Sequence, residues 1–97
     1  PQGLVIKWPN DLLVEGAKLA GILLERVDNH VVVGVGINLV SAPDIAGRKT
    51  THLAAVGCPM DRDSVAGAMA SHFMEGLADW RGGGWPDAVL ARWYAAA

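Results

Sequence analysis

The hydrophobic and polar positions along the chain divide it into two parts of different character. Residues 4–40 are rich in Val, Ile and Leu and are interrupted by turn-forming residues, a pattern typical of β-strands. Residues 50–97 are rich in Ala and Met, and their apolar positions recur at helical spacing. The pattern therefore predicts an α+β protein, with an antiparallel or mixed sheet packed on helices.

The first part of the chain predicts four strands joined by tight turns. The expected strands cover residues 4–8, 12–14, 18–27 and 30–40. The breaks between them contain Pro, Gly, Asn and Asp, which favour turns for different backbone reasons. Links this short imply antiparallel neighbours, so we expect a strand meander over residues 4–40.

The second part predicts helices over about residues 50–96. A short helix is expected to begin at the threonines of residues 50–51 and to end near Gly57. A longer helix, capped by Asp61 or Asp63, should run to about residue 80, and a last helix should begin near Pro86. The apolar positions of the longer helix form one stripe: Val65, Met69, Phe73, Leu77 and Trp80.

Length, charge and cysteine content restrict the class of protein. The chain has 97 residues, enough for one small domain, and 52% of them are hydrophobic. The net charge of -2 and the lack of a basic run argue against nucleic acid as the main partner. Cys58 is the only cysteine, which fits a reducing cytosol. Apolar runs of about ten residues are too short to span a bilayer.

The start of the chain is unusual for a natural N-terminus. The first residue is Pro1 rather than Met, and the chain opens almost directly into an apolar run. We therefore expect that residues upstream of Pro1 are missing.

The fourth expected strand carries two glycines on one face. Because side chains alternate between faces, Gly34, Gly36 and Asn38 share a face, and the valines between them should meet the helices from the other. Glycine weakens a strand, so two alternate glycines need a reason. A flat ligand on the sheet is one reason, and close packing against another backbone is the other.

Lys18 is a second candidate for function. It begins a strand after a tight turn and is followed by small or apolar residues, including Gly21. A lysine at such an edge can aim its ammonium group at a phosphate or carboxylate, a contact of roughly 4 kcal/mol at ~4 Å before desolvation. The alternative is an ordinary solvated lysine.

The segment from Lys7 to Asp11 is the third candidate. Lys7 shares a strand face with Val5, so it could be buried and paired with Asp11. The alternative is a plain strand end closed by a turn. Asp11 could instead help to hold Mg²⁺, which favours carboxylate oxygens. The three histidines have no metal-ligand spacing among themselves or with Cys58.

Together these segments resemble biotin protein ligases. The resemblance rests on KWPND at residues 7–11, KLAGILLE at residues 18–25 and GVGINL at residues 34–39, in this order. Residues 50–53 resemble the helix that follows in that family. The match is close over residues 4–40 and loose over residues 41–97.

The resemblance implies a fold and a reaction. The implied fold is that of biotin ligase catalytic domains, related to class II aminoacyl-tRNA synthetases and here truncated, with residues 1–97 as the C-terminal part of that domain. In the reaction, biotin attacks the α-phosphate of Mg·ATP to give biotinyl-5'-AMP, and a lysine of a biotin carboxyl carrier protein then accepts the biotin. The resemblance therefore implies ATP, Mg²⁺ and biotin as ligands, the carrier protein as partner and a cytoplasmic location.

The resemblance also assigns roles to individual residues. Lys18 would be catalytic, contacting the biotin carboxylate and the α-phosphate. Gly34 and Gly36 would form the floor of the ligand site, and Asn38 would hydrogen-bond the adenine.

The remaining roles concern the edges of the ligand site. Gly21 and Ile22 would line the biotin side. Asn10 and Asp11 would lie near the phosphates and the metal. Trp8 and Lys7 would support the turn that carries them.

The family also has parts that this sequence lacks. Its Gly/Arg-rich loop, which wraps the biotinyl-adenylate, precedes KWPND and is absent. The DNA-binding domain of some members and the small SH3-like domain are absent as well. We therefore expect little or no ligase activity from the 97 residues alone.

Two other functions remain open on sequence grounds. A lipoate-protein-ligase-like acyl-adenylate enzyme would share the lysine and the fold. A non-catalytic remnant would only pair with another chain, since in some members the strand bearing G-x-GIN lies near a dimer interface, and a homodimer is compatible with either function.

Overall fold

The computed structural model describes residues 3–81 and 95–96 of the 97-residue chain. It divides the chain into two compact units, Pro1–Pro59 and Met60–Ala97, which are described separately below. The first unit contains the strands and the second contains a long helix.

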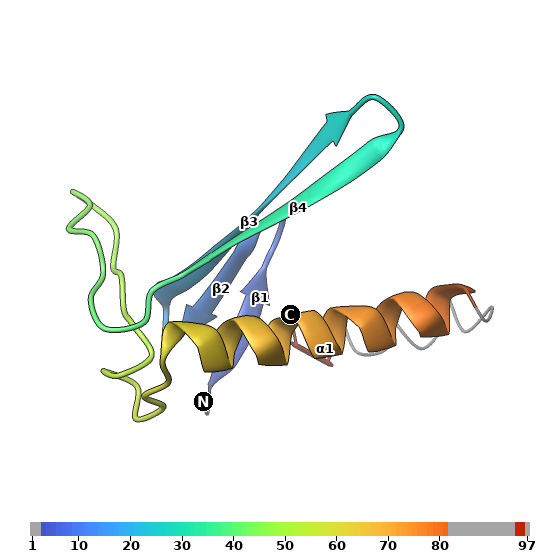
Figure 1. Ribbon diagram of the computed structural model, residues 1–97. Coiled ribbons are helices and arrows are strands. Elements are labelled where there is room, and N and C mark those ends of the chain that lie inside the picture. The colour runs from blue at the N-terminus through green and yellow to red at the C-terminus, as the bar shows by residue number, and fades with distance from the viewer. Residues whose placement is uncertain (1–2, 82–94, 97) are drawn as a thin grey trace. The chain divides into compact units, whose positions relative to one another are not determined.

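The first unit is built on a four-stranded antiparallel sheet (Figure 1). Its strands follow chain order, so each lies beside the strand that precedes it: β1 (Leu4–Lys7), β2 (Asp11–Val14), β3 (Ala17–Val27) and β4 (His30–Ile37). The expected meander is confirmed, and the expected α+β class with it. The fourth strand ends three residues earlier than the sequence predicted, because residues 38–40 leave the sheet.

Tight turns give the meander its short links. Between β2 and β3, Glu15 and Gly16 both adopt left-handed backbone conformations, with φ of 50° and 81°. Two consecutive residues with positive φ match the twist of a two-residue hairpin, and Gly16 meets that requirement without strain. Asp28 has φ of 52° in the turn between β3 and β4.

A register shift separates the two ends of the β2–β3 pairing. Leu12 pairs with Ala20, but Leu13 pairs with Lys18, so Leu19 is an extra residue on β3. An extra residue of this kind is a β-bulge, and it moves the following side chains to the opposite face of the strand. The consequence is that Lys18 and Gly21, three residues apart, lie on the same face of the sheet.

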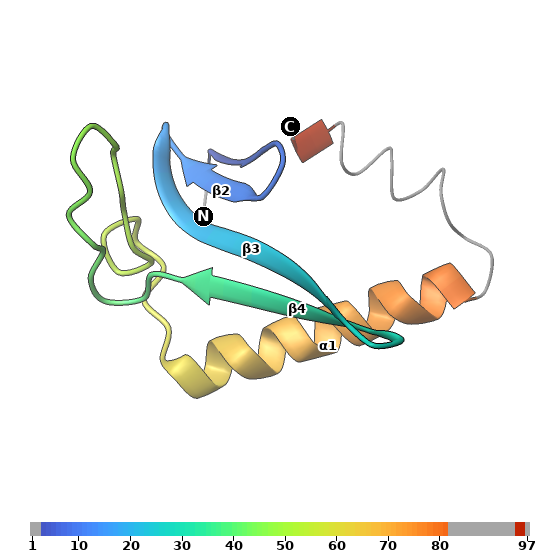
Figure 2. The ribbon, with the colours of Figure 1, turned by 90° about the horizontal axis from the view of Figure 1, so that it is seen from above.

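Beyond the bulge, β3 and β4 continue past the short β1 and β2 as a two-stranded hairpin (Figure 2). Many large apolar side chains of this hairpin are exposed; they include Leu23, Leu24, Val27, Val31, Val33 and Val35. The expectation that the valines of β4 would pack against helices is therefore not confirmed.

Residues 49–54 run along the ends of β3 and β4. The amide of Lys18 donates to the carbonyl of Lys49 at 2.9 Å, and the amide of Thr51 donates to the carbonyl of Lys18 at 2.9 Å. These bonds form an isolated parallel bridge between Lys18 and Thr50. The predicted short helix from residues 50–51 is wrong: the threonines pair with the sheet, and only turns follow, ending at Gly57 with φ of 78°.

The buried core of the first unit lies where this crossing segment meets the sheet. Val14, Leu19 and Ala20 of the sheet and Leu53 of the crossing segment are 2–7% exposed. The bulged residue Leu19 is thus a core residue, and its carbonyl also accepts the amide of Asn38 at 3.0 Å. Burial of Leu19 fixes the bulge in place.

The second unit contains α1 (Arg62–Arg81). The amide of Ser64 donates to Asp61 Oδ1 at 2.7 Å, so Asp61 is the N-cap of α1. Asp61 was one of the two residues predicted for this position. The helix expected from Pro86 lies outside the described residues. Among the residues that the structure describes, no helix is long and apolar enough to cross a membrane.

The cap predicts a pH dependence for α1. The hydrogen bond from the Ser64 backbone lowers the pKa of Asp61 below its ordinary value of 3.8. A depressed pKa in the folded state means that the cap stabilises α1 above pH 3.8 and loses this effect as the pH falls through the lowered pKa. Far-UV circular dichroism between pH 5 and pH 2.5 should therefore show helix loss in the wild-type chain.

Asp61→Asn is the matched control, because its amide oxygen still accepts from Ser64 but does not titrate. Helix loss in Asp61→Asn should be smaller over this range, and Asp61→Ala should already have less helix at pH 5. Identical acid profiles for wild type and Asp61→Asn would contradict the assigned cap.

Candidate functional site

A row of directly paired residues crosses all four strands, at the end of β1, the start of β2 and near the end of β4. Lys7 pairs with Asp11, Asp11 with Gly21, and Gly21 with Gly36. Paired residues on neighbouring strands project to the same face. This face therefore combines a carboxylate with two positions that have no side chain, as the sequence predicted for Gly36.

The ammonium group of Lys18 lies above Gly21. A Cβ atom added at Gly21 would be 3.3 Å from Lys18 Nζ and 3.4 Å from Lys18 Cε. Glycine at position 21 thus makes room for the lysine side chain, which would otherwise have to move by a few tenths of an ångström. The bulge at Leu19 produces this contact, since it puts Lys18 on the Gly21 face.

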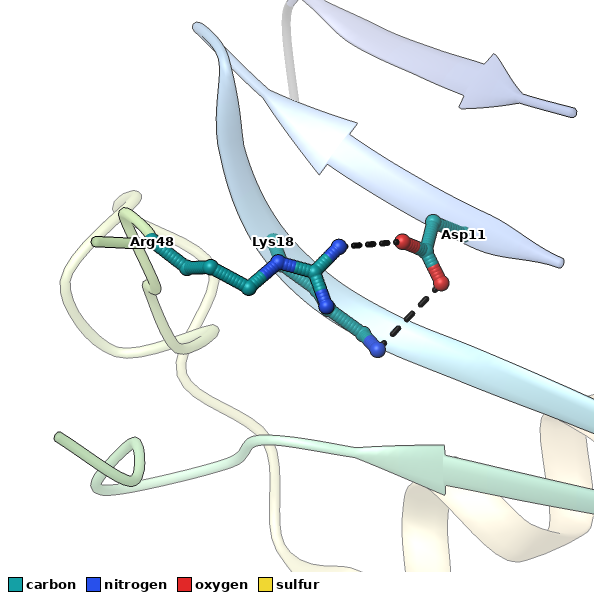
Figure 3. A network of polar contacts seen from close by, with 3 residues as sticks. All are labelled: Asp11, Lys18 and Arg48. Atoms are coloured by element: carbon teal, nitrogen blue, oxygen red, sulfur yellow. Dashed lines mark hydrogen bonds and ion pairs between the residues drawn. The ribbon is translucent and has the colours of Figure 1, made fainter. Parts of the chain in front are cut away.

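Asp11 holds Lys18 in this position. Lys18 Nζ is 3.2 Å from Asp11 Oδ1, and Arg48 Nη2 is 3.3 Å from Asp11 Oδ2, so each carboxylate oxygen faces one cation (Figure 3). The Asp11 side chain is only 18% exposed. The predicted pairing of a buried Lys7 with Asp11 is wrong: Lys7 is exposed, and the ion pairs of Asp11 are with Lys18 and Arg48.

A pocket of about 280 Å³ opens beside Lys18 on this part of the sheet. Four residues that the sequence singled out line it together: Lys18, Gly21, Gly36 and Asn38. Ala20 and three residues from the segment after β4 complete the lining: Pro43, Ile45 and Thr50. A cation at the rim of a pocket with a glycine floor suits a flat ligand that carries an anionic group.

The other predicted site residues do not line this pocket. Gly34 lies two residues before Gly36 in β4, opposite Leu23, and Ile22 points to the face opposite Gly21. The carbonyl of Asn10 accepts the amide of Ile22 at 2.8 Å, which gives Asn10 a structural contact. Trp8 is 75% exposed. Their assignment to substrate or ATP binding stays a prediction.

Asn38 connects β4 to the crossing segment. Its side-chain Nδ2 donates to the carbonyl of Thr51 at 3.0 Å, and its own carbonyl accepts the amide of Leu53 at 2.9 Å. These bonds fix the orientation of the amide group at the pocket wall. The side-chain oxygen accepts no hydrogen bond from the part of the chain that the structure describes, so it can accept one from a ligand.

Arg48 and the pocket wall formed by the loop after β4 were missed by the sequence analysis. Pro43 is joined to Thr50 by a 2.9 Å bond from Thr50 Oγ1 to the Pro43 carbonyl. Arg48 lies in a loop 37 residues from its partner Asp11, and a pair so far apart in sequence produces no local pattern that could predict it. The sequence analysis likened residues 50–53 only to the helix that follows in the family and assigned them no place at the site.

A metal site is not evident in the residues described. No group of three or more His, Cys, Asp or Glu side chains in the described ranges is placed to hold a metal ion. Asp11, the predicted Mg²⁺ ligand, has a cation at each oxygen. Its geometry favours a role in holding Lys18, and the metal role stays a prediction.

Comparison with known families explains this arrangement. Residues 2–38 match the model of the Biotin/lipoate A/B protein ligase family. This segment contains β1 to β4 and five of the residues that line the pocket: Lys18, Ala20, Gly21, Gly36 and Asn38. Over residues 2–38 the chain therefore resembles the biotin/lipoate A/B protein ligase family.

The chain is also similar to biotin ligases. It is 39% identical over 77 residues to the biotin–acetyl-CoA-carboxylase ligase of Mycobacterium tuberculosis, a match that covers 78% of this chain and 29% of that enzyme. It is 54% identical over 46 residues to the enzyme of that name from Paracoccus denitrificans, covering 42% of this chain and 19% of the relative. The chain thus spans less than a third of the length of these curated relatives.

The fold is shared with a solved biotin protein ligase. The structure of the Leishmania major enzyme in complex with biotinyl-5-AMP superposes with a TM-score of 0.86 at 22% sequence identity. The superposition covers 98% of this chain and 39% of that one. At this identity the likeness establishes the fold.

The contact between Lys18 and Gly21 can be tested without a ligand. Gly21→Ala should displace the Lys18 ammonium group and weaken its pair with Asp11, because the new methyl group would lie 3.3 Å from Nζ. The lysine tip is flexible and partly exposed, so the stability loss should stay below about 1 kcal/mol. The ¹³Cε resonance of Lys18 should shift in the NMR spectrum.

Gly36→Ala is the matched control, since nothing lies within 4 Å of a Cβ at that position. The Lys18 resonance should stay unchanged in this variant. Equal shifts in the two variants, or none in either, would show that Lys18 does not lie over Gly21.

Proposed function

We propose that this chain forms the part of a biotin protein ligase site that binds the phosphate linkage of biotinyl-5'-AMP. The observation that carries the proposal is the Lys18 ammonium group, held by Asp11 over Gly21 at the rim of a pocket floored by Gly36. The supporting comparison is the 39% identity to the M. tuberculosis ligase.

The size of the pocket fits part of such a ligand. Small-molecule sites usually have volumes of roughly 300–1,000 Å³, and this pocket of about 280 Å³ lies at the lower limit. An acyl-adenylate is an elongated molecule, so this pocket would hold its middle, where the acyl group joins the phosphate. Biotin and adenine would extend to either side along the sheet.

The first reaction step follows from this placement. A biotin carboxylate oxygen attacks the α-phosphorus of ATP, a new P–O bond forms, and the bond to the bridging oxygen breaks so that pyrophosphate leaves. Negative charge on the α-phosphate oxygens builds in the transition state. The proposed role of Lys18 is to stabilise this charge from a position that Asp11 and Gly21 have already fixed.

In the second step, the amine of an acceptor lysine attacks the carbonyl carbon of the mixed anhydride. The C–O bond to the phosphate breaks, AMP leaves, and the amine loses a proton. Lys18 would again face the phosphate, now as it becomes part of the leaving group. We propose a biotin carboxyl carrier protein as the source of the acceptor lysine.

The remaining residues have supporting roles in the proposal. The side-chain oxygen of Asn38 would accept a hydrogen bond from the adenine amino group, with Thr51 holding the amide in place. Mg²⁺ would enter as the partner of the ATP phosphates. A cytoplasmic location and a homodimer are compatible with this function and stay predictions.

A hybrid enzyme tests the proposal directly. The hybrid is the M. tuberculosis ligase with residues 2–59 of this chain in place of its corresponding segment. Biotin-dependent exchange of pyrophosphate into ATP should be measurable, and Lys18→Ala should lower its rate by about 100-fold or more, the scale for loss of one charge-stabilising group.

Arg26→Ala is the control, because it removes an exposed positive charge remote from the pocket. Among the residues that the structure describes, the Arg26 side chain donates a hydrogen bond only to the carbonyl of Asp28. This variant should exchange at the rate of the hybrid. Exchange that persists in Lys18→Ala would overturn the role of Lys18. Exchange that depends on lipoate instead of biotin would replace the proposal with the lipoate ligase alternative.

A further inference from the structure

Arg48 shares the Asp11 carboxylate with Lys18. Arg48 Nη2 is 3.3 Å from Asp11 Oδ2, while Lys18 Nζ is 3.2 Å from Asp11 Oδ1. Figure 3 shows that the two cations approach the carboxylate from the loop and from β3, respectively. Lys18 lines the pocket, and the shared carboxylate holds the Arg48 guanidinium group next to Lys18, outside the residues that line the pocket.

The position of Arg48 is set by the backbone around it. Its amide donates to the carbonyl of Ile45 at 3.1 Å, which closes a turn in the loop. The next residue, Lys49, accepts the amide of Lys18 at 2.9 Å through its carbonyl. The main chain next to Arg48 is thus hydrogen-bonded to the main chain of Lys18, which sets the relative positions from which the two side chains extend.

Positive charge exceeds negative charge at this point of the sheet. Asp11 is a single carboxylate that forms ion pairs with Lys18 and Arg48, and the exposed Lys7 lies opposite it in the register of β1 and β2. The Arg48 side chain is 50% exposed and that of Lys18 29% exposed, so both can reach a ligand. A guanidinium group has five N–H donors. The contact with one carboxylate oxygen of Asp11 leaves other donors of Arg48 available to a ligand.

We infer that Arg48 is a second cationic contact for the phosphate of the bound ligand, and that Asp11 keeps Arg48 and Lys18 together when the pocket is empty. A guanidinium group is suited to a phosphate because two of its N–H groups can contact two oxygens at once. The inference deepens the proposed function and rests on it for the identity of the phosphate ester.

An ion pair as exposed as Arg48–Asp11 contributes little to stability, so the fold does not depend on it. Arg48→Gln can therefore be studied in the same hybrid enzyme as a binding variant. Its dissociation constant for biotinyl-5'-AMP should rise by about tenfold or more, the scale for a lost hydrogen bond to a charged group. Arg48→Lys should recover part of this affinity.

Two controls separate a phosphate contact from a change in loop structure. Lys49→Gln removes the neighbouring exposed cation but keeps the carbonyl that accepts from Lys18, and its affinity should match that of the hybrid. Biotinol, a neutral analogue without carboxylate or phosphate, should bind Arg48→Gln and the unmodified hybrid equally well. An equal loss of biotinol and adenylate affinity would overturn the inference, as would an unchanged adenylate affinity.

AMP binding distinguishes failure of this inference from failure of the proposed function. If the hybrid binds AMP in a manner that depends on Arg48 but shows no biotin-dependent exchange, the phosphate contact stands and the ligase proposal fails. If Arg48→Gln shows the same exchange rate and the same adenylate affinity as the unmodified hybrid, the ligase proposal stands and Arg48 has no part in it.

Discussion

The β-bulge at Leu19 is the constraint on which the rest of the site depends. A regular strand would place Lys18 and Gly21 on opposite faces, because side chains alternate and the two residues are three apart. With Leu19 as the extra residue, Lys18 pairs with Leu13 and reaches Asp11 across the neighbouring strand. The core maintains this irregularity, since Leu19 is only 3% exposed.

The same constraint links local backbone geometry to chemistry. The crossing segment at residues 49–54 bonds to both sides of Lys18 and brings Arg48 and the pocket wall with it. Asp11 then supplies the one negative charge that keeps two cations from separating. A pocket with a fixed cation and a glycine floor needs little rearrangement to bind a phosphate ester, which is how such sites stabilise developing charge.

Much of the sheet could be predicted from sequence, because apolar runs and turn residues determine strands and hairpins locally. Glycine alternation likewise indicated the Gly36 face, and the order of the motifs indicated the family. The bulge, the Arg48 pair and the unwound residues 50–57 could not be predicted in this way. They depend on hydrogen bonds and packing between segments up to 37 residues apart, which no local periodicity encodes.

The central claim is that Lys18, Gly21, Gly36 and Asn38 form one binding surface for an acyl-adenylate. A titration of the ¹⁵N-labelled 97-residue chain with biotinyl-5'-AMP, followed by NMR, tests it residue by residue. The account predicts that the amide signals of these four residues shift together, while those of α1 stay in place. Shifts confined to α1, or none at the four pocket residues, would contradict it.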